Sequence, residues 1–335
     1  MTNWDRVSDG EGFVVSSAER SAGDGQDMIS TIVNKAKDLG FITCGFSSPE
    51  RPLYFDKFRD WLSDGKNADM SWLERNVEIR EDPASLLKGC KAVISLAYPY
   101  PSQKPGTPEG FTVSRYSQPT QEDYHVRLKG LCGELVDLIG EICPGSESRI
   151  CVDSAPILER SFASSGGIGF IGKNNMLIIP GHGSYFYLAE ILSTANLEFS
   201  STEPMENQCG NCTRCIDSCP TGALEKPFYL DASKCLSYLT IEDKGRTKRD
   251  MGRKMGDCFF GCDRCQEACP FNEDDASMQI HLPATDAFLQ MNDKEFGGRF
   301  GHTAFARAGL EKLKSNIQAM RAHDETAFRP KLKAS

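Results

Sequence analysis

The sequence has no long hydrophobic run. Its most apolar stretches, AVISLAYPY at 92–100 and MLIIP at 176–180, are far shorter than the roughly 18 residues that a membrane-spanning helix needs. The N-terminus MTNWDRVSDGEGFVV has no basic segment followed by an apolar one, so it lacks the pattern of a secretory signal. We therefore expect a cytoplasmic protein that does not engage a membrane.

The chain also lacks an excess of positive charge. Its formal net charge is −9, which argues against uniform attraction to nucleic acid, although a whole-chain sum can hide a local basic face. Two segments are candidates for such a face: 244–257 has six basic and two acidic residues, and the tail from Phe305 has seven basic and three acidic residues. Hydrophobic residues make up 39% and charged residues 25%, close to average usage, so neither a disordered nor a fibrous protein is indicated.

Cysteine, in contrast, is abundant. The chain has fourteen cysteines, and cytoplasmic thiol reductants disfavour disulfides, so metal ligation is the leading explanation. Nine of them fall between 209 and 272. The other five lie in apolar predicted strands or helices, where a free cysteine behaves as a small hydrophobic residue; they are Cys44, Cys90, Cys132, Cys143 and Cys151.

Composition and periodicity divide the 335 residues into four parts. Residues 1–25 are rich in Gly, Ser and Asp, and we expect a disordered extension. Residues 26–200 mix predicted helices and strands, which indicates an α/β (mixed α+β) domain. Residues 201–275 contain the nine clustered cysteines, and 276–335 are expected to form a small helical C-terminal tail.

Within residues 26–200 the sequence predicts a series of helices and strands. Apolar residues at helical spacing predict a helix from Met28 to Gly40, followed by the strand FITCGF. Further expected elements are a helix at 54–62, a buried strand at 91–98, a long helix at 122–142 and the strand RICV. Between 156 and 193 we expect a short helix, a glycine-rich loop and a β-hairpin made by two apolar runs around PGHGS.

The clustered cysteines follow iron–sulfur spacing. CGNCTRCIDSCP has the CxxCxxCxxxCP pattern of bacterial ferredoxins, in which the fourth cysteine ligates the other cluster when two are present. CDRCQEACP repeats the second half of that pattern, so two [4Fe–4S] clusters should exchange their last ligands. The ligands of the first cluster are then Cys209, Cys212, Cys215 and Cys269. The second cluster has only three in register, Cys219, Cys262 and Cys265.

The second cluster lacks one ligand because Phe259 stands where a cysteine is expected. Cys258, one position out of register, and Cys235, between the two motifs, are both candidates, and spacing alone does not decide between them. A zinc site is the alternative, since CxxC pairs also bind zinc, but two interleaved CxxxCP endings are not a zinc-ribbon pattern.

Several motifs in order resemble one family. They are RYS and DYH within 115–125, VDSAP and ER within 152–160, GGIGFIGKNN at 166–175, KCLSYLTIE at 234–242 and FGCDRCQEACPFN. Over roughly 28–320 the chain resembles the epoxyqueuosine reductases, which are cobalamin and iron–sulfur enzymes of tRNA modification. The resemblance implies a cobalamin-binding domain similar to the nitroreductase-like and reductive-dehalogenase core, followed by a ferredoxin-type 2[4Fe–4S] domain.

The resemblance also implies a reaction, the last step of queuosine biosynthesis. Epoxyqueuosine at the wobble position of tRNA anticodons is reduced to queuosine, with electrons passing through the two clusters to cobalamin. Our hypothesis is that Co(I) attacks an epoxide carbon while a nearby acid protonates the oxygen. In the family the cysteine before SYLTIE is a cluster ligand, which assigns the vacant position to Cys235.

Asp153 is the candidate acid, because the matching aspartate is the proposed proton donor of the family. It follows the strand RICV, and in open α/β sheets ligands gather beyond the carboxyl ends of strands. Partial burial among Val152, Ala155 and Pro156, together with a stacked corrin, is expected to raise its pKa and favour its protonated form. The alternative is an aspartate that only caps the turn after the strand.

Further cobalamin contacts are carried over from matching motifs. The loop 166–175 can approach a large cofactor closely because glycine leaves backbone N–H groups exposed. Its GIGFIG fits a dinucleotide fingerprint only loosely and follows a helix, so we do not expect NAD. His125 is interpreted as an ordinary helix histidine rather than a cobalt ligand. The expected cobalamin-binding residues are Arg75, Tyr116, Asp153, Lys173, Asn174, Asn175 and Ser237.

The expected partners follow from this reading. One is the anticodon stem-loop of tRNA carrying epoxyqueuosine, recognised partly through its phosphates. The other is an external low-potential electron donor. We expect the protein itself to be a monomer. Two rivals stay open. A reductive dehalogenase would normally carry a twin-arginine export signal, and a ferredoxin-type electron carrier would not take up cobalamin.

Overall fold

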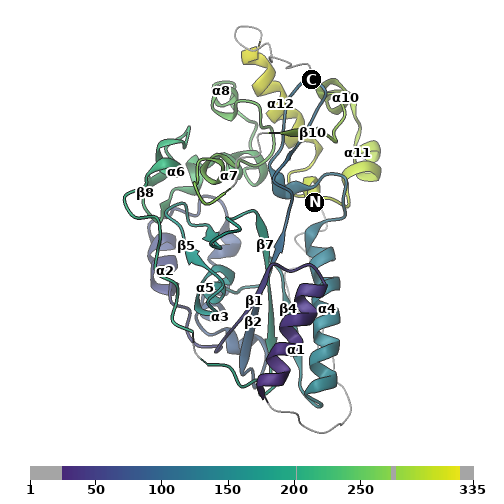
Figure 1. The fold of residues 1–335 in the computed structure, drawn as a ribbon. Helices are drawn as coiled ribbons and strands as arrows, with labels where there is room; N and C mark the ends of the chain where they lie inside the picture. The colour runs from purple at the N-terminus through teal and green to yellow at the C-terminus, as the bar shows by residue number, and fades with distance from the viewer. Residues whose placement is uncertain (1–24, 201, 273–276, 325–335) are drawn as a thin grey trace. The chain divides into compact units, whose positions relative to one another are not determined.

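The computed structural model describes residues 25–200, 202–272 and 277–324 (Figure 1). Nearly all of the expected N-terminal extension lies outside these residues. The chain forms two compact units: the first takes residues up to Gly65, 71–100 and 125–211, and the second takes 66–70, 101–124 and the residues from Cys212 onward. The domains expected from the sequence are each one continuous stretch, so they do not include these exchanges of short segments between the two units.

A four-stranded sheet forms the centre of the first unit. Its order is β1 (Thr43–Ser47), β2 (Ala92–Pro99), β7 (Phe186–Ser193) and β4 (Ser148–Cys151), and every neighbouring pair is antiparallel. The two central strands are buried along most of their length. The strands predicted at FITCGF, 91–98 and RICV are confirmed.

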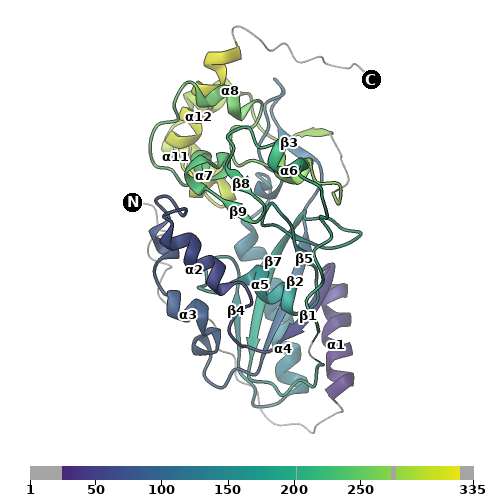
Figure 2. The same ribbon diagram turned by 90° about the vertical axis from the view of Figure 1, so that its left-hand side faces the viewer.

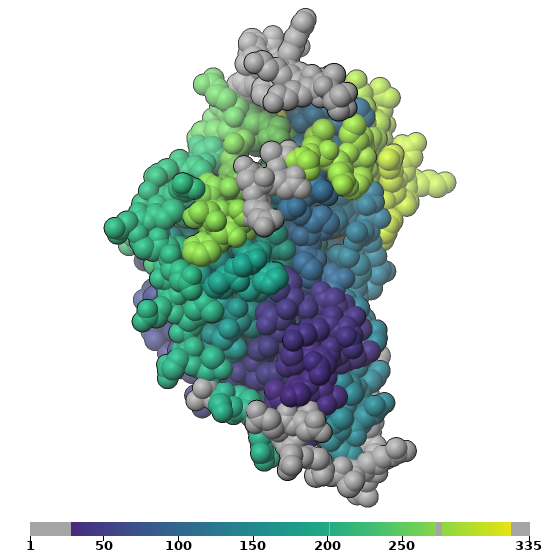
Figure 3. Space-filling view, in the orientation of Figure 1, coloured from purple at the N-terminus to yellow at the C-terminus, as the bar shows by residue number. Residues whose placement is uncertain are grey.

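Helices cover both faces of this sheet. α1 (Gly25–Asp38) and α4 (Tyr124–Ile142) lie on one face, and α5 (Glu159–Ser165) lies on the other (Figure 1 and Figure 2). The surface of α1 lies beside that of α4 (Figure 3). An ion pair joins the two helices, with Nζ of Lys35 2.7 Å from Oε2 of Glu134. The predicted long helices are confirmed. The unit also contains α2 (Phe55–Ser63), η2 (Ser71–Leu73), α3 (Val77–Glu81) and η3 (Pro83–Leu86).

The hairpin expected around PGHGS forms only at its tip, where Ile179 and Gly183 make an antiparallel bridge, and the two apolar runs do not pair with each other. β6 (Leu177–Ile178) pairs backward with β5 (Phe170–Ile171), whereas β7 enters the main sheet between β2 and β4. Nearly every residue of β7 is buried, because this strand lies in the middle of the sheet with both faces covered. Its partners are therefore strands that are distant in sequence.

The second unit consists of short elements. β3 (Lys104–Gly106) pairs in parallel with β10 (Met278–Ile280), and β8 (Leu224–Lys226) pairs with β9 (Tyr229–Leu230). Its helices are η4 (Arg115–Ser117), α6 (Arg214–Asp217), η5 (Ala232–Lys234), α7 (Leu236–Ile241), α8 (Met251–Met255), α9 (Arg264–Glu267), α10 (Thr285–Gln290), α11 (Asp293–Phe300), η6 (Ala304–Arg307) and α12 (Leu310–Asp324).

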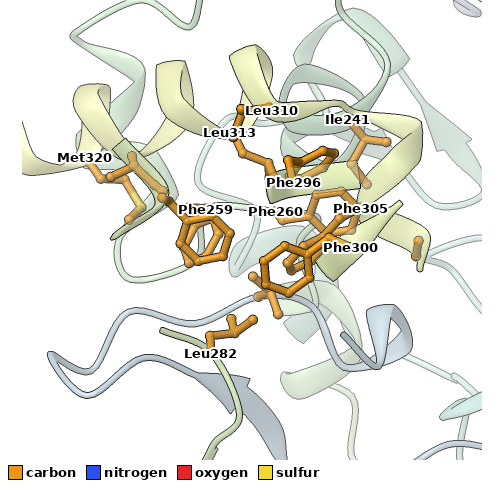
Figure 4. Close-up of a cluster of buried hydrophobic side chains, with 14 of the residues drawn as sticks. Ile241, Phe259, Phe260, Leu282, Phe296, Phe300, Phe305, Leu310, Leu313 and Met320 are labelled. Atoms are coloured by element: carbon orange, nitrogen blue, oxygen red, sulfur yellow. The ribbon is translucent and has the colours of Figure 1, made fainter. Parts of the chain in front are cut away.

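One aromatic core holds the second unit together (Figure 4). Phe259 and Phe260, from the cysteine-rich segment, pack with Phe288 of α10 and Leu313 of α12. The C-terminal helices therefore share a core with the cluster-binding segment. Among the described residues, no helix combines the length and the apolar character needed to span a membrane.

Candidate active site and cluster-binding segment

Asp153 occupies a strained turn directly after β4. Its φ of 54° is in the left-handed region, where aspartate is one of the more tolerated residues. Its backbone N–H donates to Oε1 of Glu159 at 2.6 Å, and its Oδ2 lies 3.1 Å from Nε2 of His125. The turn is thus fixed from two sides. His125 therefore orients the carboxyl of the candidate acid.

The surroundings of Asp153 differ from the expectation in two respects. Its side chain is 58% exposed, so the neighbouring Val152, Ala155 and Pro156 alone do not bury it, and the contribution of a stacked corrin stays a prediction. The sheet is antiparallel, so the rule about the carboxyl ends of parallel strands does not apply to β4.

Two further carboxyl groups lie beside this turn. Glu190 of β7 is completely buried, and Glu159 at the start of α5 is partly buried. Burial, followed by the Asp153 carboxylate, raises the pKa of Glu159, and burial followed by the Glu159 carboxyl raises the pKa of Glu190 well above its ordinary value. Sequence reasoning missed both residues. A lone glutamate in the apolar strand FYLAEILS was the available signal for Glu190.

The loop GKNN is tied to the first cysteine motif. Lys173 donates from Nζ to the carbonyl of Gly210 at 2.6 Å, and Asn207 donates to the carbonyl of Ile171 at 2.6 Å. Asn174 is 5% exposed and accepts the N–H of Met176 at 3.2 Å. The loop therefore supports the backbone around Cys209, and its contact with a cofactor stays a prediction.

Asn175 and Arg75 also lie in the first unit. Asn175 has a φ of 63°, and its carbonyl accepts a hydrogen bond from the guanidinium of Arg160. Arg75 is exposed in the turn between η2 and α3, where its carbonyl accepts from Nη1 of Arg80 at 2.5 Å.

Tyr116 and Ser237 belong to the second unit. Tyr116 is half-buried in η4, with its ring centroid 6.2 Å from that of Tyr124 and 6.1 Å from that of Phe260. Ser237 is half-buried in α7, two residues after Cys235. Cofactor contact by these two residues also stays a prediction.

A buried ionic network fastens the second cysteine motif. Arg115 donates from Nη1 to Asp263 at 3.2 Å and to Glu267 at 2.6 Å, and its backbone N–H donates to Asp263 at 2.8 Å. Lys104 adds a 2.6 Å ion pair with Glu267. Because Asp263 and Glu267 flank Cys265, the network fixes the backbone of a predicted cluster loop.

Four thiols influence one another electrostatically. Burial raises the pKa of Cys235, with a further contribution from the thiol of Cys219. Burial also raises the pKa of Cys262 to about 12, and there Cys235 is a contributing neighbour. Burial, followed by the thiols of Cys262 and Cys235, raises the pKa of Cys265 well above its ordinary value. Cys235 therefore neighbours all three in-register ligands of the second cluster: Cys219, Cys262 and Cys265.

Cys258 and Phe259 have different surroundings. Cys258 is 5% exposed and its thiol donates to the carbonyls of Phe260 at 3.4 Å and Gly261 at 3.6 Å. Phe259 is fully buried, and its ring centroid lies 5.6 Å from that of Phe288. Phe259 serves packing, whereas the buried thiol of Cys258 also interacts with that of Cys262. Within the described residues, no group of three or more His, Cys, Asp or Glu side chains is arranged to hold a single metal ion.

The chain combines two features: an α/β unit with a fixed, exposed acid, and a segment with ferredoxin-type cysteine spacing. Together they define the class of iron–sulfur oxidoreductases with a separate catalytic domain. Comparison with known proteins narrows this class. Residues 208–272 match the family model described as "4Fe-4S double cluster binding domain", and residues 80–154 match "Epoxyqueuosine reductase QueG, DUF1730".

Similar proteins extend the match over most of the chain. The epoxyqueuosine reductase of Cellulophaga algicola is 34% identical over 300 residues, covering 84% of this chain and 94% of that protein. The Bacillus subtilis protein of the same name is 31% identical, covering 88% and 79%. A crystal structure of epoxyqueuosine reductase with an epoxyqueuosine-modified tRNA-Tyr stem-loop has a TM-score of 0.80 at 30% identity, covering 91% and 83%. The chain belongs to the epoxyqueuosine reductase family.

Proposed function

We propose that this protein reduces epoxyqueuosine in the anticodon loop of tRNA to queuosine. The observation that carries the proposal is the 34% identity with an epoxyqueuosine reductase along 94% of that relative, together with a tRNA stem-loop bound by a structural neighbour. The reaction removes the epoxide oxygen as water and leaves an alkene, so each turnover consumes two electrons and two protons.

Two [4Fe–4S] clusters and cobalamin are the cofactors. The first cluster takes Cys209, Cys212, Cys215 and Cys269, and the second takes Cys219, Cys235, Cys262 and Cys265. The electrostatic proximity of Cys235 to Cys219 and Cys265 supports it as the fourth ligand of the second cluster, whereas Cys258 interacts with Cys262 and its thiol donates to backbone carbonyls. Iron–sulfur potentials extend down to about −700 mV, low enough for one-electron delivery to a strongly reducing centre.

Two exposed charged groups of the first unit suit the presence of a large polar cofactor. Asp153 presents an exposed carboxyl and Arg75 an exposed guanidinium, which can serve the amides and phosphate of cobalamin. When bound, cobalamin supplies a reduced cobalt nucleophile for the epoxide carbon.

Asp153 is the proposed proton donor. Opening an epoxide puts negative charge on its oxygen, and a positioned acid that protonates this oxygen lowers the barrier. His125 and Glu159 hold the aspartate in one orientation, which is the geometric requirement for such an acid. The Bacillus subtilis relative has been captured with its aspartate-bearing catalytic loop swung out of the active site, and this supports a catalytic turn here.

The tRNA partner is supported by exposed charge. All six basic side chains between 244 and 257 are exposed, in and around α8. Such a segment can follow phosphates while single-stranded bases enter a pocket. We further propose that the protein works in the cytoplasm as a monomer and takes electrons from an external low-potential donor.

A single-turnover assay tests the role of Asp153. The protein, purified anaerobically with cobalamin, is mixed with reductant and an epoxyqueuosine-bearing stem-loop, and the wobble nucleoside is analysed by mass spectrometry. Asp153→Asn should slow queuosine formation by about a hundredfold or more while cobalamin stays bound. Asp137→Asn, at an exposed position of α4, is the matched control. Full turnover by Asp153→Asn with bound cobalamin would disprove the assignment.

A further inference from the structure

The segment CFFGC, which leads into Cys262, follows a closely fitted path through the second unit. The carbonyl of Phe260 accepts the N–H of Ser114 at 2.8 Å. Gly261 has a φ of 74°, which glycine adopts without strain, and a Cβ there would lie 2.1 Å from Oγ of Ser114. One side of the segment is therefore fixed by the chain that precedes η4.

The segment is tied to α7 by one buried hydroxyl. Thr240 is 0% exposed, and its Oγ1 accepts the N–H of Gly261 at 2.9 Å and donates to the carbonyl of Leu236 at 2.7 Å. Leu236 directly follows Cys235, and Gly261 directly precedes Cys262. A single side chain thus joins the two segments that carry these predicted ligands of the second cluster.

A buried amide of α12 joins the same two segments. Asn316 is 0% exposed, and its Nδ2 donates to the carbonyls of Thr240 and Phe259, each at 2.9 Å. Its Oδ1 accepts a hydrogen bond from the hydroxyl of Thr247. The amide therefore uses both of its N–H groups on backbone carbonyls, one in each segment. We call the side chains of Thr240 and Asn316 the polar clasp.

The polar clasp lies within apolar surroundings. The adjacent residues Ile241, Phe260 and Ile317 all belong to the aromatic core (Figure 4), and none is more than 5% exposed. Water is not at hand there to replace a lost hydrogen bond. A buried N–H left unpaired in such a place shifts an equilibrium by roughly fivefold to a hundredfold. Loss of the Thr240 hydroxyl should therefore have a measurable effect on the contact between α7 and CFFGC.

We propose that Thr240 and Asn316 are positioning residues for the second cluster, which hold the segment of Cys235 against the segment of Cys262. Neither side chain ligates iron, but groups that do not touch a metal centre can orient its ligands and affect how tightly it is held. The polar clasp opposes the local opening in which α7 leaves CFFGC and the cluster becomes accessible. This inference rests on the ligands assigned in the proposed function.

Release of iron to a chelator tests the polar clasp in the anaerobically reconstituted protein. Thr240→Val keeps the size of the side chain but lacks the hydroxyl, whereas Thr240→Ser keeps the hydroxyl. Thr240→Val should lose about half of its iron, equal to one cluster, about tenfold faster than the unaltered protein, and the remainder at the unaltered rate. Thr240→Ser should restore slow release. Unchanged release from Thr240→Val would overturn the proposal.

Thr303→Val is the matched control. Thr303 is 1% exposed, and its Oγ1 donates to the carbonyl of Phe300 at 2.8 Å and accepts the N–H of Phe305 at 3.3 Å. It therefore makes the same two kinds of hydrogen bond as Thr240, at the edge of the same core. Both valine variants should lower the melting temperature by a similar amount, but Thr303→Val should release iron at the unaltered rate. Equal acceleration in both would show only a general loss of stability and would overturn the polar clasp.

Asn316→Asp provides a second variant, because it keeps the shape of the amide but has no N–H to donate. It should release the same half of the iron about tenfold faster or more. Unaltered release from the folded variant would contradict a role for Asn316. If this variant does not fold, the comparison of Thr240→Val with Thr240→Ser and Thr303→Val still decides the proposal.

The polar clasp and the ligand assignment can fail separately. About four iron atoms per chain in Cys235→Ser, together with unchanged release from Thr240→Val, would leave the ligands in place and overturn the polar clasp alone. About eight iron atoms in Cys235→Ser would remove that ligand and the role of the polar clasp with it. Neither measurement depends on queuosine formation, so failure of the proposed reaction is detected independently in the single-turnover assay.

Discussion

Phe259 gives the sharpest prediction about the cluster-binding unit, because it stands at a ligand position yet serves as a core residue. Its side chain is fully buried among Phe288, Leu313 and other members of the aromatic core. Its carbonyl accepts a hydrogen bond from Nδ2 of Asn316 at 2.9 Å, and this bond does not depend on the side chain. Phe259→Ala therefore removes packing and leaves the backbone contact in place.

The magnitude follows from the loss of a buried aromatic ring. Phe→Ala in a core costs about 3 to 5 kcal/mol in transfer and cavity terms. For a unit of this size, 1 kcal/mol lowers the melting temperature by about 2 to 4 °C, so we expect a drop of about 6 to 20 °C. The same substitution at Phe228, which is 39% exposed, should lower it by only about 1 to 2 °C.

The assay is thermal unfolding of the anaerobically reconstituted protein at one scan rate, followed by far-ultraviolet circular dichroism and by cluster absorbance. Both signals should fall earlier in Phe259→Ala than in Phe228→Ala. Iron content before heating should be unchanged, because Phe259 contributes no ligand. A melting temperature within about 2 °C of the unaltered protein would refute the reasoning from burial.

Three other predictions concern the clusters, the buried carboxyl and tRNA. Cys235→Ser should lower iron from about eight to about four atoms per chain, whereas Cys258→Ser should retain about eight; the reverse result would reassign the ligand. Because burial raises the pKa of Glu190, its contribution to stability is full at acidic pH and is lost as pH rises past the ordinary carboxyl range. Glu190→Gln, which cannot ionise, should therefore melt higher than the unaltered protein at pH near 9 and lose that advantage near pH 4, in the ordinary carboxyl range; an equal difference at both would count against a neutral buried Glu190. Replacing Lys248 and Lys254 with Gln should reduce the log–log salt slope of stem-loop binding by about 1.4, and an unchanged slope would remove 244–257 from the tRNA surface.

Local sequence patterns predicted the elements of the first unit but not their pairing. The apolar spacing of α1 and α4 and the β-branched run of β2 depend on neighbours within a few residues, so they can be read directly. The position of β7 between β2 and β4 depends on strands far away in sequence. For this reason the expected pairing of the two apolar runs around PGHGS was wrong.

The site shows the same division between local and tertiary information. Spacing predicts seven cluster cysteines, but choosing between Cys235 and Cys258 requires knowing which thiol neighbours Cys219. Phe259 could not be recognised as a core residue from its motif, because its partners come from α10 and α12. Glu190 was missed because a single charged residue in an apolar strand gains meaning only when its burial is known.

The central claim is tested most directly by following the wobble nucleoside of an epoxyqueuosine-bearing stem-loop during anaerobic titration of the cobalamin-loaded protein with a one-electron reductant. The account predicts queuosine, lighter by one oxygen atom, at one molecule for every two electron equivalents beyond those that reduce the bound cofactors. Full reduction of the clusters and cobalamin with the epoxide intact would contradict it.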